Sequence, residues 1–387
     1  MVYLDNAATT YPKPVSVYNE VNRCIRLYGA NPGRSGHRMS MNAAQQVYLS
    51  REAAARLYNV ENVENISFTQ NCTYALNTVI KGFLKRGDHV VVSDLEHNSV
   101  LRPLSGMASQ GITYTVAKAE HGDFDKTIDN FRKAINEKTK LFIVNHASNV
   151  TGAVLPLSRL TALAHQYDIK VLADTAQSSG ALPIDVQEMQ LDFMASAGHK
   201  GLMGIMGTGI LYVKNPELVS PLVCGGTGSG SLELVQPDTM PDKLESGTCN
   251  LPGICSLRAG IEFLSSKGIE NIYKHEFVLL KALYDGLKDI PGIRLYTPEP
   301  KPLYNAPVLS FNVGDMQSED TAEILDKKYS VAVRAGIHCA PLAHKALGTQ
   351  KQGTVRISLS YFNNMSHINR ALNAVRNISH DYRRSSV

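Results

Sequence analysis

KVLADTAQSSG (170–180) and LDFMASAGHKGLMG (191–204) are the two stretches that decide the fold of this chain. The first is an apolar, β-branched run that ends in an acid, Asp174, as a buried parallel strand would. The second is another short apolar run, closed by small residues and then by Lys200, 26 positions after Asp174. Ligands in parallel sheets bind beyond the carboxyl ends of the strands, so we expect these two side chains to share a site.

Lys200 and Asp174 are the two side-chain types that pyridoxal phosphate chemistry requires. A lysine at this position is suited to forming a Schiff base, and an acid at a neighbouring strand end is suited to holding a pyridinium nitrogen protonated. The pair therefore predicts an enzyme that uses pyridoxal 5′-phosphate.

Short apolar runs alternate with longer amphipathic segments from about residue 60 to residue 215. The runs predicted as strands are 66–69, 89–95, 112–116, 140–148, 169–175, 192–196 and 209–214. The segments predicted as helices are 72–85, 97–109, 126–137 and 156–167. This alternation predicts an α/β fold with a mostly parallel seven-stranded sheet flanked by helices on both faces.

The sequence changes character around 224–255, where loops are dense in Gly, Ser and Thr. A long helical stretch over about 253–290 then precedes the short apolar runs PGIRLY, PVLSFNV, VAVRAG and TVRISLS. We expect a smaller α+β C-terminal domain here. The predicted division is a large cofactor-binding domain, 15–255, and a small domain built from 1–14 and 256–387.

The composition is that of an ordinary soluble globular protein, with 387 residues, 43% hydrophobic, 19% charged and a net charge of +4. No basic stripe interleaved with aromatics argues for nucleic acid. The six cysteines form no CxxC pair and give no zinc spacing, so we expect no metal and a reducing, cytoplasmic location. The N-terminus lacks the pattern of a secretory signal, and no stretch is apolar and long enough to span a membrane.

FTQNCTYALN (68–77) is expected to form a strand end, a polar loop and a helix start. Backbone N–H groups and the helix dipole would favour an anion there. Thr73 adds a hydroxyl, although taken alone a threonine at a helix start is more often an ordinary N-cap. With Ser196 and His199, which precede Lys200, it completes a predicted three-sided cradle for the cofactor phosphate.

Two further side chains fit the cofactor ring. Gln177, three residues after Asp174, could reach the ring hydroxyl. His97 follows another predicted strand end and could stack on the open face of the ring. A structural role for His97 is the alternative.

Cys339 lies in VAVRAGIHCAPLAH (331–344), on a predicted polar loop. One interpretation is a small buried hydrophobe. The other is a mobile nucleophile, with His338 and Arg334 favouring its thiolate. Arg356 lies mid-strand among apolar residues, where a substrate carboxylate or an internal Asp or Glu would pair with it.

Seven motifs occur in order from about residue 3 to residue 365 and together resemble the class V aminotransferase-like group, specifically cysteine desulfurases and selenocysteine lyases. They are YLDNAATT (3–10), EHNS (96–99), NHASNVTGAV (145–154), DTAQSSG (174–180), SAGHKGLMG (196–204), ESGTCN (245–250) and RAGIHCAP (334–341). The resemblance implies a fold-type I pyridoxal phosphate enzyme that is a homodimer with active sites at the subunit interface.

The resemblance also assigns a role to each candidate residue. For the cofactor ring it implies Lys200 as the Schiff base, Asp174 at the ring nitrogen, Gln177 at the ring oxygen and His97 stacked on the ring. For the cofactor phosphate it implies Thr73, Ser196 and His199, with Cys72 in the same loop as Thr73, and Thr248 at the phosphate site of the partner subunit. It implies that Asn149, Arg356 and Ala8 bind the substrate and that Cys339 carries the persulfide.

The implied activity is removal of sulfur from L-cysteine, giving L-alanine and a persulfide on Cys339 that passes to a protein sulfur acceptor. The freed Lys200 would take the Cα proton. Alternatives on the same fold are selenocysteine lyase, cysteine-sulfinate desulfinase and class V aminotransferase. A silent scaffold for a sulfur acceptor is a further alternative.

The chain departs from the family pattern at two positions. Cys72 stands where many relatives carry a hydroxyl residue. Its place at a helix start makes it a rival low-pKa thiol, although an adjacent phosphate dianion would oppose that. Ile337 stands where one subgroup has histidine, which bears on activation of the Cys339 thiol.

Overall fold

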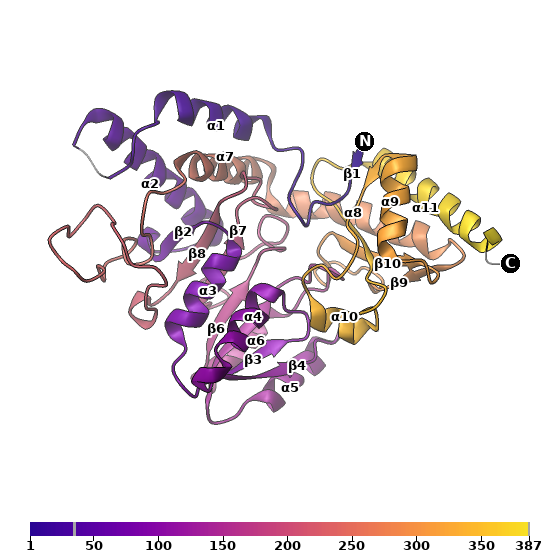
Figure 1. Ribbon diagram of the computed structural model, residues 1–387, viewed down its shortest axis with the longest axis horizontal. Coiled ribbons are helices and arrows are strands. Elements are labelled where there is room, and N and C mark those ends of the chain that lie inside the picture. Colours follow the sequence, from indigo (N-terminus) through magenta and orange to yellow (C-terminus); the bar gives the residue numbers. More distant parts are fainter. Residues whose placement is uncertain (34–35, 386–387) are drawn as a thin grey trace.

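Seven strands form the central sheet of the computed structural model, which describes residues 1–33 and 36–385 (Figure 1). Their order across the sheet is β2-β8-β7-β6-β5-β3-β4. The bounds are β2 (Ile66–Thr69), β3 (His89–Ser93), β4 (Thr113–Ala117), β5 (Thr139–Asn145), β6 (Lys170–Asp174), β7 (Phe193–Ala197) and β8 (Gly209–Val213). Strand β8 is antiparallel to both of its neighbours, and every other adjacent pair is parallel. The predicted α/β class with a mostly parallel seven-stranded sheet is confirmed.

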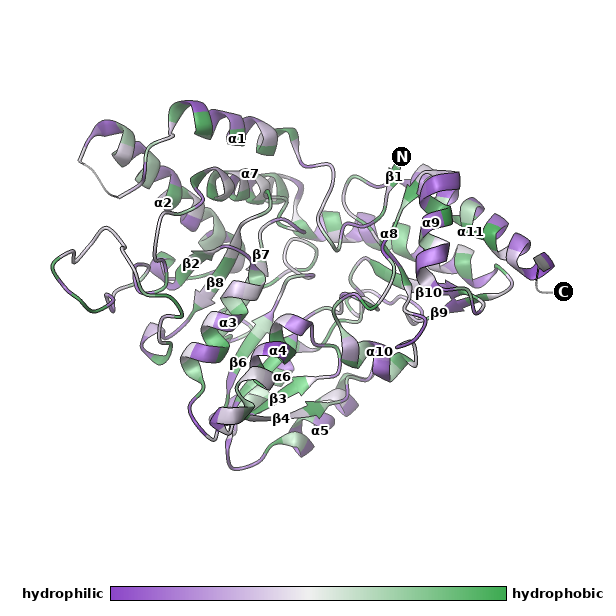
Figure 2. Ribbon diagram, in the orientation of Figure 1, coloured by the Kyte–Doolittle hydropathy of each residue, from purple (hydrophilic) through white to green (hydrophobic). Residues whose placement is uncertain are grey.

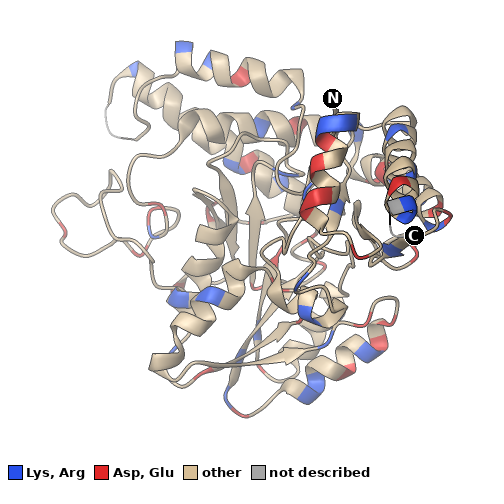
Figure 3. Ribbon diagram, turned by 45° about the vertical axis from the view of Figure 1, so that its right-hand side comes forward, with Lys and Arg blue, Asp and Glu red and all other residues tan. Residues whose placement is uncertain are grey.

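Helices cover both faces of this sheet because successive strand residues point to opposite sides. One apolar core contains Phe142 and Val171 and is closed by α2, α5, α6 and α7. The opposite core contains Ile143 and Leu172 and is closed by α3 and α4. The bounds are α2 (Arg38–Tyr58), α3 (Cys72–Phe83), α4 (Asn98–Gly106), α5 (Phe124–Ala134), α6 (Leu157–His165) and α7 (Leu251–Lys267). The sheet strands are predominantly hydrophobic (Figure 2), and charged residues lie mostly on the helices and loops around them (Figure 3).

The single helical stretch predicted over about 253–290 is wrong in one respect, since it is two helices. Helix α7 ends at Lys267, and α8 (Ile269–Lys288) begins two residues later. Gly268 separates them with a φ of +77°, a left-handed conformation that glycine adopts without steric cost and that a helix interior does not allow.

A second group of elements has its own apolar core. A three-stranded antiparallel sheet has the order β12-β10-β9, and β1 pairs with β11 in parallel. Helices α8, α9 and α11 pack with these strands around residues such as Leu4, Leu283 and Phe311. The remaining bounds are β1 (Val2–Tyr3), β9 (Ile293–Leu295), β10 (Val308–Val313), β11 (Val331–Ala332), β12 (Val355–Ser358), α1 (Val15–Leu27), α9 (Ser318–Tyr329), α10 (Pro341–Leu347) and α11 (Met365–Ser385).

The division of the chain into domains at residues 14 and 255 stays a prediction. Helix α7 continues across the second boundary and packs against α1 and α2. In the described part of the chain, no helix is both long and apolar enough to cross a membrane.

Candidate active site

Strands β6 and β7 carry Asp174 and the loop of Lys200 to one cavity of about 100 Å³. Asp174 is the last residue of β6 and only 3% exposed. Its Oδ1 accepts a hydrogen bond from the backbone N–H of Ala176 at 3.0 Å. The other lining residues are Asn71, Cys72, Thr73, His97, Ser99, Asn145, Asn149, Ala176, Gln177, Ala197 and His199. The predicted meeting of Asp174 and Lys200 at the carboxyl edge of the sheet is thus found.

Two glycines allow the loops after β6 and β7 to touch. A Cβ atom on Gly201 would lie 2.2 Å from the backbone oxygen of Ser179, and one on Gly180 would lie 2.2 Å from the oxygen of Gly201. No larger residue fits such an approach without backbone movement. Thr10 adds a hydrogen bond of 2.8 Å from its hydroxyl to the backbone oxygen of Lys200. The position of Lys200 is therefore fixed by its backbone neighbours.

The electrostatic surroundings favour the neutral form of Lys200. Burial is the largest effect and lowers the pKa of the amine. Arg356 and Arg334 lower this pKa as well, while Cys72 and Asp174 act in the opposite direction. A buried lysine of this kind can act as a nucleophile or a proton acceptor.

His97 is fixed at the start of α4. Its Nδ1 accepts a hydrogen bond from the backbone N–H of Ser99 at 3.1 Å and lies 2.8 Å from the Ser99 hydroxyl. Burial lowers the pKa of the imidazole, which therefore favours the neutral ring. A neutral aromatic ring held at the cavity wall is suited to stacking.

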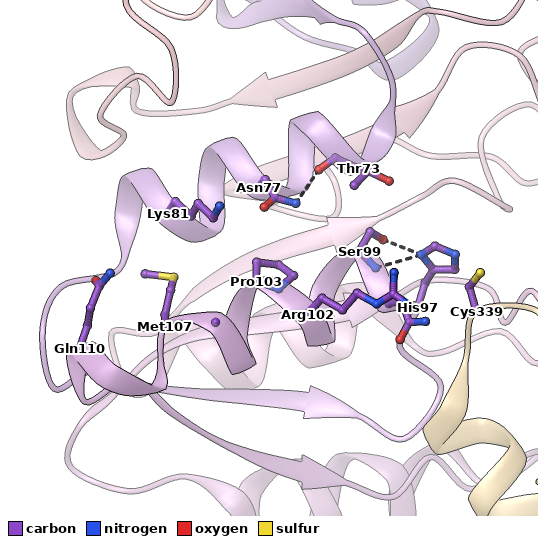
Figure 4. A pocket seen from close by; sticks show the side chains of 12 residues that line it. Thr73, Asn77, Lys81, His97, Ser99, Arg102, Pro103, Met107, Gln110 and Cys339 are labelled. Atoms are coloured by element: carbon purple, nitrogen blue, oxygen red, sulfur yellow. Dashed lines mark hydrogen bonds between the residues drawn. The ribbon is translucent and has the colours of Figure 1, made fainter.

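Cys339 lies beside His97 in a second cavity of about 610 Å³ (Figure 4). The two cavities share Thr73, His97 and Ser99 as walls. Cys339 is exposed, with a φ of +57°, and its backbone oxygen accepts a hydrogen bond of 2.8 Å from the N–H of Asn98. The structure thus supports an accessible thiol and contradicts the interpretation of Cys339 as a buried hydrophobe.

The expectation that His338 favours the Cys339 thiolate is wrong. His338 is buried, and its Nε2 lies 3.0 Å from the backbone oxygen of Thr354. Burial, reinforced by Arg356, lowers the pKa of His338 to about 2. The ring is neutral at physiological pH and carries no charge with which to stabilise a thiolate.

Cys72 is also not a rival low-pKa thiol. It is buried at the cavity wall, and its Sγ donates to Asp174 Oδ1 at 3.6 Å. Burial and the neighbouring Asp174 carboxylate raise the pKa of this thiol well above its usual value. The start of helix α3 does not overcome these two effects.

The Ser196 hydroxyl does not reach the cavity. It is fully buried within hydrogen-bond distance of Thr175, Ser179 and Tyr58, at 2.6, 2.9 and 3.1 Å. Adjacent strand residues point to opposite faces, and it is Ala197 that lines the cavity. The expected phosphate contact of Ser196 is therefore not supported by the geometry.

Other predicted residues lie outside the walls of this cavity. Thr248 lines a separate cavity of about 480 Å³ together with Arg51 and Glu245. Ala8 does not line the cavity either, but its neighbour Ala7 accepts a hydrogen bond of 3.0 Å from Gln177 Nε2. The roles assigned to Thr248 and Ala8 stay predictions.

Arg356 has an internal carboxylate partner. The residue is 1% exposed, and its guanidinium donates to Asp5 Oδ1 at 2.9 Å and to the backbone oxygen of Asn149 at 3.0 Å. Its Nε is buried without a partner in the described residues, as is Asn149 Oδ1. The Asn149 amide nitrogen donates to the backbone oxygen of His338 at 2.7 Å. Asn149 lines the cavity at Lys200 but Arg356 does not, so the contact of Arg356 with a substrate stays a prediction.

Glu96, which the sequence interpretation did not single out, lies behind the cavity wall and holds the backbone of Asn145, a residue that lines the cavity. It is fully buried, and its Oε1 accepts hydrogen bonds from the Ser93 hydroxyl at 2.6 Å and the Asn145 N–H at 2.9 Å. Burial, with a contribution from Asp174, raises the pKa of Glu96 to about 8. The available signal was an acid immediately before His97 at a strand end.

The residues around the cavity fit pyridoxal phosphate. Asp174 and Lys200 face the same space as His97 and Gln177. The Nδ1 of His199 is buried without a partner among the described residues, and burial lowers the pKa of this ring to about 4. A neutral histidine with a free nitrogen, in the turn after β7 and at the wall of the cavity, is suited to hydrogen-bonding a phosphate. In residues 1–33 and 36–385, no cluster of His, Cys, Asp and Glu is suited to a metal.

A family model, relatives by sequence and a solved structure all relate this chain to the same family. A family model described as aminotransferase class-V matches residues 2–371. A probable cysteine desulfurase of Methanothermobacter thermautotrophicus is 35% identical over 378 residues, covering 95% of this chain and 92% of its own length. A cysteine desulfurase of Salmonella agona is 31% identical over 379 residues, covering 96% and 91%. The apo structure of a cysteine desulfurase from Thermococcus onnurineus superposes with a TM-score of 0.89 at 32% identity, covering 98% of this chain and 95% of the other.

Proposed function

The chain belongs to the class V aminotransferase family, and from this premise we propose that it is a pyridoxal-phosphate-dependent cysteine desulfurase. The reaction converts L-cysteine to L-alanine and leaves the sulfur as a persulfide on Cys339. The observation that carries the proposal is the arrangement of two adjoining cavities. One is lined by Asp174 and Lys200, and the other places the exposed Cys339 beside His97.

The proposed cofactor contacts follow the cavity wall. Lys200 would hold the cofactor covalently, Asp174 would keep its ring nitrogen protonated, and His97 would stack on the ring. Thr73 and His199 would face the phosphate, and Gln177 the ring oxygen. When bound, the cofactor supplies an electron sink for the pair of electrons released at the substrate Cα.

Lys200 and Arg356 are proposed to act on the substrate. Burial lowers the pKa of the Lys200 amine, which favours the neutral form that would accept the Cα proton. The guanidinium of Arg356 would bind the substrate carboxylate, with Asn149 of the cavity wall beside it.

Cys339 is proposed to take the sulfur as a nucleophile. Its thiolate forms a sulfur–sulfur bond with the substrate sulfur, while the substrate carbon–sulfur bond breaks and its electron pair stays on the carbon. That carbon gains a proton and becomes the methyl group of L-alanine. The exposure of Cys339 on its loop supports this role, since the thiol must first meet the substrate and then a sulfur acceptor.

We also propose a homodimer with active sites at the interface, in which Thr248 serves the partner subunit's phosphate site. A protein sulfur acceptor would then remove the persulfide sulfur. The cytoplasmic location stays a prediction.

The test is mass spectrometry of the protein after incubation with L-cysteine, together with assay of L-alanine. We expect a sulfur-sized adduct on the Cys339 peptide, present in Cys72→Ala and absent in Cys339→Ala. We also expect a yellow protein absorbing near roughly 420 nm, whose colour is lost in Lys200→Ala. A colourless protein would favour a scaffold, and an adduct on Cys72 would refute the choice of thiol. Turnover of selenocysteine or cysteine sulfinate by Cys339→Ala, with no turnover of cysteine by the parent, would favour the alternative lyases.

A further inference from the structure

A groove runs from Cys339 between α3 and α4 (Figure 4). On α3 it is lined by Thr73, Asn77 and Lys81, which are four residues apart and therefore share one helix face. On the opposite side lie Ser99, Arg102, Pro103, Gly106, Met107 and Gln110 from α4 and the turn after it. We call this the α3/α4 groove. Its volume of about 610 Å³ is much larger than the cavity of about 100 Å³ at Lys200, so it has room for more than a single amino acid.

The groove carries positive charge that nothing in the described chain neutralises. Lys81 and Arg102 are both exposed. Neither has an ion pair or side-chain hydrogen bond among residues 1–33 and 36–385. No Asp or Glu of the described chain lines the groove. A concave surface with one sign of charge attracts a partner of the opposite sign.

We propose that the α3/α4 groove docks an acidic, thiol-bearing segment of the protein that accepts sulfur from Cys339. This inference rests on the proposed desulfurase function. The carboxylates of the acceptor segment would pair with Lys81 and Arg102, which lie on opposite walls of the groove. The cysteine of the segment would lie at the end of the groove where Cys339 is exposed.

The transfer needs no added oxidant or reductant. The acceptor thiolate attacks the outer sulfur of the Cys339 persulfide and forms a new sulfur–sulfur bond. The bond between the two sulfurs on Cys339 breaks, and its electron pair leaves with the Cys339 thiolate. The acceptor then carries the persulfide, and Cys339 is ready for the next cycle.

The test measures transfer of labelled sulfur from the holoenzyme, loaded with L-cysteine, to three probes. The first is a short peptide whose single cysteine is flanked by Asp and Glu, the second is the same peptide with Lys at those positions, and the third is dithiothreitol. We expect the acidic peptide to react about tenfold faster than the basic one at low salt, with the advantage shrinking as salt is added.

The variant Lys81→Glu/Arg102→Glu should remove the advantage of the acidic peptide or reverse it. Formation of L-alanine in the presence of dithiothreitol should stay unchanged. Arg86→Glu, an exposed cation just beyond α3 that does not line the groove, is the matched control and should behave like the parent protein.

Equal rates for the two peptides, or rates that the double variant does not change, would overturn the inference. A change of oligomeric state in the double variant, measured by sedimentation, would also overturn it, because the groove would then be covered by a second copy of the chain. Failure of the proposed function has a different signature, since no persulfide would form on Cys339 before any peptide is added.

Discussion

Replacing Glu96 by glutamine is expected to stabilise the protein increasingly as the pH rises. Burial raises the pKa of Glu96 from its usual 4.5 to about 8. Between these values the native carboxyl keeps its proton while the unfolded chain releases it, so the unfolded state binds fewer protons and stability falls with rising pH. At about 1.4 kcal/mol per pH unit, the free energy of unfolding falls by about 5 kcal/mol across the window between the two pKa values.

Glutamine has no proton to lose, and its amide oxygen can still accept from the Ser93 hydroxyl and the Asn145 N–H. The free energy of unfolding of Glu96→Gln, minus that of the parent, should therefore increase by about 3 kcal/mol between pH 5 and pH 7. Any cost of fitting the NH₂ group shifts both values equally and cancels from this difference.

Urea unfolding at both pH values, at fixed protein and cofactor concentration, measures the effect. Glu64→Gln, at an exposed carboxylate, is the control. If the stability gap between Glu96→Gln and the parent is the same at pH 5 and pH 7, Glu96 is ionised in the native protein and the reasoning fails.

Two other substitutions test the framework of the site. Gly201→Ala would place a methyl group 2.2 Å from the Ser179 oxygen, so we expect unfolding free energy to drop by about 1–3 kcal/mol and cofactor absorbance to fall. Gly106→Ala, where the added atom meets nothing within 4 Å, should retain both, and equal behaviour of the two variants would contradict the close-contact argument. Arg51→Ala removes a guanidinium that donates to both oxygens of Glu245, at 2.7 and 2.9 Å, and leaves that carboxylate without its cation, holding only the backbone N–H of Phe68 among the described residues. The expected loss is about 3–5 kcal/mol in chemical denaturation, and a loss below about 1 kcal/mol would show that Glu245 finds another partner or is solvated.

The amino-acid sequence is sufficient for the sheet and for the meeting of Asp174 and Lys200. Strand and helix periodicities are local properties of the chain. Ordered alternation of the two leaves a parallel sheet as the arrangement that buries them. The carboxyl ends of such strands meet at one edge. Residues at these ends could therefore be grouped without knowing any contact.

The direction of side chains and their protonation could not be predicted from the local sequence pattern. Ser196 and Ala197 are adjacent, yet only the second faces the cavity, because the strand alternates and its phase is set by what packs on each face. Arg356 finds its carboxylate in Asp5, 351 positions away along the chain. No local pattern encodes that pairing.

His338 and Glu96 show the same limit for charge. In the sequence, His338 next to Cys339 suggests a cation that activates the thiol, and Glu96 after a strand suggests an ordinary ionised carboxylate. Burial makes both neutral over much of the physiological range, with pKa values near 2 and 8. The sequence by itself determined the elements and the edge where they meet, because those follow from local periodicity. Only the tertiary structure decided which groups are desolvated, because water is excluded by residues distant in the chain.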